Sequence, residues 1–65
     1  MTLIASKEDA EKEAMRLMEE RGLHDELVLS DGTAHFIWEC ESPLGILYIH
    51  GEQHSLGWTV SIVGS

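Results

Sequence analysis

The sequence predicts an α+β fold in which one amphipathic helix packs on an antiparallel sheet of three or four strands. Two observations carry this prediction. Apolar residues recur with a period near 3.6 over residues 6–21, which indicates a helix. From Glu26 onward apolar and polar residues alternate between turn residues, which indicates a meander of strands joined by hairpins. The 65 residues suffice for one domain, 1–65, so the helix and the hairpins share one core.

Signals for both ends accompany the predicted helix. Ser6 suits the N-cap, and the acidic Glu8 and Asp9 follow in the first turn, where the helix dipole favours negative charge. Gly22 suits the left-handed position after the last turn, so Leu23 can fold back as in a Schellman motif. The stripe that faces the sheet consists of Ala10, Ala14, Leu17 and Met18.

The first hairpin is predicted at Asp31-Gly32, which lies between two alternating segments. Asp-Gly is a strong signal for a two-residue type I′ turn, because both turn residues need φ > 0. In that register Leu27 lies opposite Phe36. Leu29 lies opposite Ala34, so both leucines are expected on the core face.

The second hairpin is predicted at residues 42–45. Its sequence Ser-Pro-Leu-Gly has proline and glycine where a type I turn favours them. In that register Cys40 faces Leu47 and Trp38 faces Ile49 on the core face.

The last strand is predicted at residues 58–63, after a loose loop at 51–55. This strand is uncharged and rich in strand-forming residues, so a free edge there would invite pairing with another chain. A central position, cover by Thr2-Leu3-Ile4, or a second copy would each prevent this, and a monomer is favoured over a homodimer. The predicted core is Ala10, Ala14, Leu17, Met18, Leu27, Leu29, Phe36, Trp38, Leu47, Ile49, Trp58, Val60 and Ile62.

The whole chain has a net charge of −8, and its positive charge is confined to the first third. The basic residues are Lys7, Lys12, Arg16 and Arg21, and residues 22–65 contain six acidic residues and no Lys or Arg. Helix acids can pair with these bases three or four residues away, whereas the sheet acids have no such neighbours. Unpaired charge of one sign favours a partner of the opposite sign.

This composition argues against several functional classes. Phosphate binding needs clustered Lys and Arg, so neither nucleic acid nor an anionic membrane is expected as a direct partner. No apolar run approaches the ~20 residues of a membrane span, and the N-terminus does not resemble a signal peptide. One cysteine allows no intramolecular disulfide, so a cytoplasmic location is expected.

No residue pattern indicates catalysis, so we expect a non-enzyme without a cofactor. Cys40 lies between Glu39 and Glu41, whose charges raise a thiol pKa and oppose the reactive thiolate. A buried structural thiol is favoured. The glycines form no phosphate-binding loop, since no Gly-x-Gly-x-x-Gly pattern or following lysine is present.

Three histidines raise the question of a metal site. His35 and His50 are predicted on the outward sheet face, and His54 follows in the next loop. Histidines on neighbouring elements could bind Zn²⁺, but this spacing matches no compact metal motif. Solvated surface histidines and no metal are therefore favoured.

The sheet acids form the candidate binding surface. Aromatic side chains within a charged rim are typical of protein interfaces. Alternate strand residues lie about 6.6 Å apart, of the same order as successive phosphates of a nucleic acid. The alternative is an acidic surface that serves only solubility. The predicted partner-binding residues are Glu26, Asp31, Glu39, Glu41, Tyr48 and Glu52, with Glu26, Glu39, Glu41 and Tyr48 on the outward face and Asp31 at a hairpin tip.

In size, charge and element order the whole chain resembles the small anti-CRISPR proteins of phages and mobile elements. It looks most like the acidic inhibitors of type I surveillance complexes, with type I-C as the suggested subtype. No motif aligns, so no family residue is carried over. The resemblance implies binding to a basic groove that takes target DNA, with carboxylates in place of phosphates. The alternative function is a small dimeric cytoplasmic adaptor joined through residues 58–63.

Overall fold

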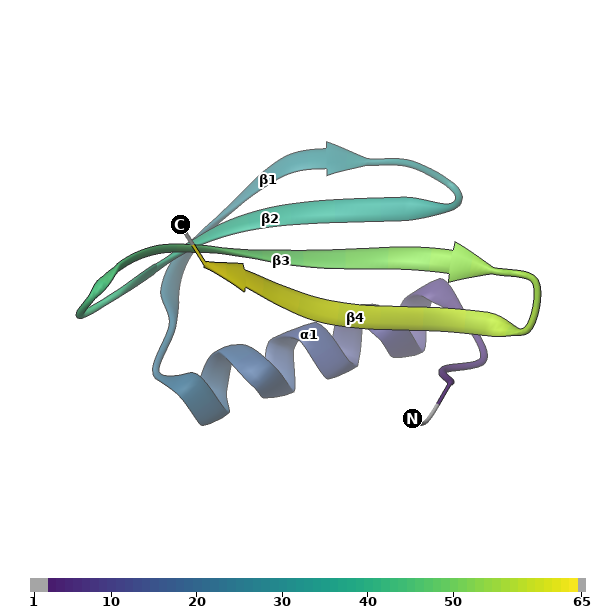
Figure 1. Ribbon diagram of the computed structural model, residues 1–65, viewed down its shortest axis with the longest axis horizontal. Helices are drawn as coiled ribbons and strands as arrows, with labels where there is room; N and C mark the ends of the chain where they lie inside the picture. The colour runs from purple at the N-terminus through teal and green to yellow at the C-terminus, as the bar shows by residue number, and fades with distance from the viewer. Residues whose placement is uncertain (1–2, 65) are drawn as a thin grey trace.

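A computed structural model describes residues 3–64 and confirms one helix packed on a four-stranded antiparallel sheet (Figure 1). Helix α1 (Lys7–Arg21) precedes the strands, whose order in the sheet is β1-β2-β3-β4. Figure 1 shows α1 running beneath β3 and β4, with the β1–β2 hairpin extending away from it. Within residues 3–64 no helix is both long and apolar enough to cross a membrane. The strands are β1 (His24–Asp31), β2 (His35–Ser42), β3 (Gly45–His54) and β4 (Gly57–Gly64).

Both ends of α1 form as predicted. Ser6 has an extended backbone, and its Oγ accepts a hydrogen bond from the Asp9 N–H at 3.2 Å. At the other end Gly22 has φ 67°, and the Leu23 N–H donates to the Met18 carbonyl at 2.8 Å. This is the Schellman motif, which returns Leu23 to the core.

The second hairpin also has the predicted register. Trp38 pairs with Ile49 and Cys40 pairs with Leu47, so the turn is closed by Ser42 opposite Gly45. The hydroxyl of Ser42 donates to the carbonyl of Gly45 at 2.8 Å and stabilises this turn.

The loose loop predicted at residues 51–55 is wrong, because β3 continues through it to His54. Gly51 pairs with Phe36 inside the sheet, and a Cβ at Gly51 would lie 2.1 Å from the Phe36 ring. The glycine therefore makes room for an aromatic ring and does not mark a turn. A tight turn at residues 55–56 then connects β3 to β4.

The first hairpin differs from the predicted one. β1 continues through Asp31 and β2 begins at His35, so residues 32–34 form the loop in place of a two-residue Asp-Gly turn. Two side-chain contacts accompany the wider loop. Asp31 forms an ion pair with Lys7 of α1, and Ser30 Oγ lies 2.7 Å from His35 Nε2. The loop is thus one residue longer than the Asp-Gly signal predicted.

β1 is also irregular along its length. Its pairing with β2 shifts by one residue within 24–27 and again within 28–30, which are β-bulges. Asp25, inside the first bulge, has φ 54°. The predicted pairing of Leu27 with Phe36 is wrong, because these shifts place Leu27 opposite Glu39, on the face away from α1. Leu27 and Leu29, predicted in the core, are 56% and 49% exposed.

The core lies between α1 and strands β2, β3 and β4. Three aromatic residues form its centre: the Phe36 ring centroid lies 5.0 Å from that of Trp38 and 6.1 Å from that of Trp58. Cys40 is buried there, as predicted for a structural thiol. Leu23 is also buried although the predicted core did not include it, whereas Leu17 is only half-buried. The buried core consists of Ala10, Ala14, Leu23, Phe36, Trp38, Cys40, Ile49 and Trp58, with Ile4, Met18, Leu47, Val60 and Ile62 partly buried against it.

β4 lies at an edge of the sheet and not in its centre. The predicted cover by the N-terminal segment is present at Ile4. The Ile4 N–H donates to the Trp58 carbonyl at 3.0 Å, and the Trp58 N–H donates to the Ile4 carbonyl at 2.7 Å. Thr2, also part of the predicted cover, lies outside the described residues.

Candidate functional site on the outer face of the sheet

We call the sheet face opposite α1 the outer face. Phe36, Trp38 and Cys40 point from β2 into the core, so the alternate residues of β2 point away from α1. Cross-strand pairing extends this face over all four strands. The outer face consists of His24, Leu27, Ser30, His35, Ile37, Glu39, Glu41, Ile46, Tyr48, His50, Glu52, Thr59, Ser61 and Val63.

Four residues form a straight row across the middle of this face, which we call the central row. Leu27 pairs with Glu39, Glu39 with Tyr48, and Tyr48 with Val63. Directly opposed side chains in antiparallel strands lie about 4.5–5.5 Å apart at Cβ. A carboxylate and a phenol are therefore neighbours at the centre of the face, between two half-exposed aliphatic side chains.

Two further predicted acids lie on the outer face beside this row. Glu41 follows Glu39 by two residues on β2 and is exposed. Glu52 pairs with His35 and belongs to β3, although the sequence placed it in a loop. Glu39, Glu41, Tyr48 and Glu52 are thus the predicted site residues that the fold brings to one face.

The other two predicted site residues lie elsewhere. Leu27 points outward, so Glu26 before it points toward the α1 side of the sheet, and the prediction of Glu26 on the outward face is wrong. Its position agrees with its charge being one cause of the raised pKa of the Cys40 thiol. Asp31 does lie at the end of a hairpin strand, but Lys7 pairs with it and compensates its charge.

The basic side chains belong to α1, on the opposite side of the sheet. Arg16 lies 2.5 Å from Glu13 and 2.6 Å from Glu20, and Lys12 lies 3.9 Å from Glu8. The hydrogen bond from Arg16 lowers the pKa of Glu13, and the two carboxylates raise the pKa of Arg16. Because residues 22–65 contain no Lys or Arg, the carboxylates of the outer face have no such partners on it.

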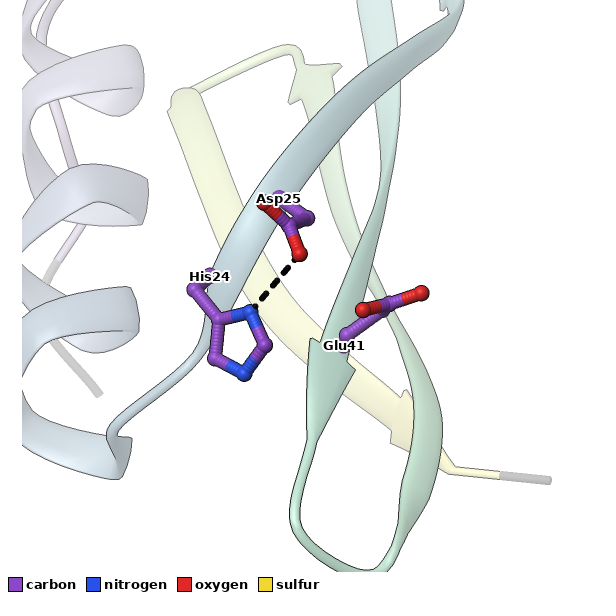
Figure 2. A group of neighbouring side chains, drawn as sticks. All are labelled: His24, Asp25 and Glu41. Carbon is purple, nitrogen blue, oxygen red and sulfur yellow. Dashed lines mark hydrogen bonds and ion pairs between the residues drawn. The ribbon is translucent and has the colours of Figure 1, made fainter.

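The first bulge of β1 adds an acidic group that sequence reasoning missed. Figure 2 shows the side chains of His24, Asp25 and Glu41 gathered at the end of the sheet, with Asp25 Oδ2 3.0 Å from His24 Nδ1. The hydrogen bond with His24 lowers the pKa of Asp25. The sequence does not predict this group, because the three side chains meet at a bulge where Asp25 has a left-handed backbone.

One imidazole and two carboxylates are donor types that divalent cations accept, and their ligand atoms lie within 4.8 Å of one another. All three side chains are exposed, and exposed groups of this kind commonly hold no ion. We therefore treat the group as part of the acidic outer face.

The three histidines considered for zinc do not form a metal-binding group in the part of the chain that the structure describes. His35 Nε2 contacts Ser30 Oγ, and His54 Nε2 lies 3.0 Å from Thr59 Oγ1. His50 pairs with Ile37 on the outer face. The histidines thus pair with separate neighbours.

Cys40 is fully buried in the core. Burial raises the pKa of its thiol, and the charges of Glu26 and Glu39 raise it further. The sequence had attributed the shift to Glu39 and Glu41; Glu39 does contribute, whereas Glu26 contributes in place of Glu41. A buried thiol with a raised pKa is a poor nucleophile.

Comparison with protein-family models, with curated proteins and with solved structures finds no match to this chain. The functional argument therefore depends on the outer face itself.

Proposed function

We propose that this protein is an acidic inhibitor that binds a basic, nucleic-acid-binding bacterial protein or complex through its outer face. In this proposal the carboxylates occupy the groove that target DNA would otherwise enter. The resemblance to acidic anti-CRISPR proteins suggests a type I surveillance complex as the first target to test.

The observation that supports the proposal most is the separation of charge between the two sides of the sheet. The helix side holds every Lys and Arg, each of Lys7, Lys12 and Arg16 paired with at least one acid. The outer face holds Glu39 and Glu41 without any such base. A surface of one sign attracts a surface of the opposite sign and speeds encounter with it.

The central row adds aromatic and apolar side chains to the charge of the outer face. Tyr48 beside Glu39 is an aromatic residue next to a carboxylate, and Leu27 and Val63 extend an apolar strip to both edges. Aromatic residues at the centre of an interface contribute much of its binding energy. Glu39 and Glu41 lie about 6.6 Å apart along β2, a spacing of the order of successive phosphates.

The proposal is tested by competition between this protein and fluorescent target DNA for a purified type I surveillance complex. We expect displacement of DNA at low salt that weakens steeply as salt rises, because the screening length falls from about 10 Å at 0.1 M to about 3 Å at 1 M. Replacing both Glu39→Gln and Glu41→Gln should weaken displacement about tenfold, or about 1.4 kcal/mol.

The matched control is Glu11→Gln with Glu19→Gln, which removes the same charge from α1 and leaves the outer face intact. This control should inhibit within about twofold of the unmodified protein, since its charges lie on the other side of the sheet. Equal weakening by both pairs would show that total charge matters and the outer face does not. Absence of displacement at low salt would reject the surveillance complex as target.

The second candidate is a small dimeric adaptor without nucleic-acid mimicry. The uncharged strand β4 at the sheet edge favours it, because such an edge can pair with another strand. Binding by an adaptor would depend on apolar contacts. Its affinity for a partner would then change little with salt and little in the Glu39→Gln, Glu41→Gln variant.

A further inference from the structure

The two edges of this sheet differ in how well they could accept another strand. β1 contains two bulges and the charged residues Asp25, Glu26 and Asp31. Bulges and charges are devices that prevent edge pairing. β4 pairs with β3 over eight residues without a register shift, and it contains no charged residue. β4 is therefore the edge suited to pairing.

The direction of the free backbone groups follows from the Ile4 bridge. Trp58 uses its N–H and carbonyl on Ile4, on the side of β4 away from β3. In an antiparallel sheet this direction alternates, so the N–H and carbonyl groups of Val60, Ile62 and Gly64 also point away from β3. An open groove of about 530 Å³, lined by Ile4, Glu13, Val60 and Ser61 among others, lies along this side.

We propose that β4 pairs antiparallel with β4 of a second copy of this chain, with Ile62 opposite the same residue of the copy. This two-fold arrangement places Val60 opposite Gly64 of the copy, and each outward N–H faces a carbonyl. The Ile4 bridge occupies Trp58, so the proposed pairing segment begins at Val60.

Three properties of β4 favour a second copy as the occupant. The pairing segment is uncharged, so two chains of net charge −8 meet there without opposed side-chain charges. Ile62 and Val60 are partly buried at the rim of the core, and pairing would bury what remains exposed. Val63 is about half exposed on the outer face and would lie beside Ser61 of the copy. The sequence favoured a monomer, with the strand central or covered by the N-terminal segment; β4 instead lies at an edge, and the described cover is the bridge between Ile4 and Trp58.

Pairing through β4 would also join the two outer faces. The central row of each copy ends at Val63, which would face Ser61 of the copy, so the two rows would lie side by side, offset by two residues, on one face. The dimer would present two sets of Glu39, Glu41 and Tyr48 on one continuous sheet. The value of this doubled surface rests on the proposed function, but the dimer itself does not.

The dimer is tested by sedimentation equilibrium of the full chain alone, so its failure is distinct from failure of the inhibitor proposal. We expect a mass that rises with concentration from 7.3 kDa toward twice that value. Ser61→Glu with Val63→Glu places like charges opposite each other twice and should raise the dimer Kd at least tenfold. Ser61→Lys with Val63→Glu places opposite charges there and should restore dimerisation to within about threefold.

The matched control is Leu44→Glu with Leu56→Glu, which adds the same charge at two hairpin tips that are 100% and 82% exposed. It should leave the Kd within about twofold, because neither tip lies on the pairing segment. The proposal would be overturned if the protein stayed monomeric up to a concentration of about 1 mM, which corresponds to a weak dimer Kd. A dimer equally stable in all variants would also overturn it. Amide exchange of Ile62 in the unmodified protein, slower at high concentration, gives a second measurement that needs no variant.

Discussion

The two hairpins that carry the sheet edges are held by different forces. The β3–β4 hairpin lies over α1, and its pairs run in continuous register from His54 opposite Gly57 to Leu47 opposite Gly64. In the β1–β2 hairpin β2 also packs on α1, but β1 lies beyond it and carries two bulges and three exposed aliphatic residues. The strands that contact α1 thus pair with each other without register shifts. The difference indicates that α1 stabilises β3 and β4, whereas β1 depends mainly on backbone pairing with β2.

The largest expected effect on stability comes from truncating a buried side chain of β4, the edge strand that packs on α1. Trp58→Ala removes a buried ring from β4 and should cost about 3–5 kcal/mol, which equals the whole stability expected for a domain of this size. Val28→Ala on β1 should cost about 1 kcal/mol or less, because its side chain is 54% exposed. Urea unfolding followed by circular dichroism measures both.

The proposed difference between the hairpins would be wrong if Val28→Ala lowered the free energy of unfolding as much as Trp58→Ala. That result would mean that β1 contributes to the core in solution. Leu29→Ala, at the second bulge, provides a second probe of the same strand and should also be mild.

A smaller effect is expected where the two hairpins meet, at Gly51 of β3 and Phe36 of β2. Gly51→Ala puts a Cβ into the Phe36 ring and should cost about 1–3 kcal/mol, because a packed core does not absorb added volume. Combining it with Phe36→Leu should cost less than the two changes added together, because the smaller side chain frees the space. Strict additivity in urea unfolding would show that the ring and Gly51 do not touch.

The smallest expected effect is the pH dependence of stability that comes from the Cys40 thiol, whose pKa is raised by burial and further by Glu26 of β1. The pKa of the Cys40 thiol is raised in the folded state, so its contribution to stability is complete below the unfolded pKa, about 8.5. Stability should therefore fall as pH rises above that value, and a Cys40→Ala variant should not show this part of the fall.

Glu26→Gln tests the position of β1 directly. Removing this charge should lower the thiol pKa, measured by thiolate absorbance, whereas Glu41→Gln on the outer face should leave it nearly unchanged. An unchanged thiol pKa in Glu26→Gln would show that this carboxylate does not lie near Cys40.

The helix and the second hairpin could be predicted because their local signals agree with the packing. Ser6 and Gly22 bound α1, and the turn at residues 42–45 fixes the pairs Trp38 with Ile49 and Cys40 with Leu47. β1 could not be predicted in the same way. The Asp-Gly signal predicted a two-residue turn, whereas β1 continues through Asp31 and residues 32–34 form the loop.

The candidate site shows the same limit. Glu39, Glu41 and Tyr48 could be placed on one face because they belong to the hairpin whose register was right. Glu26 was misplaced because a bulge reverses the facing of every residue beyond it. The role of Gly51 was missed because a glycine that accommodates a ring looks in sequence like a glycine in a loop.

The bulges of β1 have one more consequence, for the size of any assembly. A sheet that grows by edge pairing continues without limit when both edges of each copy accept a neighbour, and the product is a filament. Here two copies joined through β4 would both present the bulged, charged β1 at their outer ends. Growth would stop at two copies, so the irregular strand would limit the proposed assembly to a closed dimer.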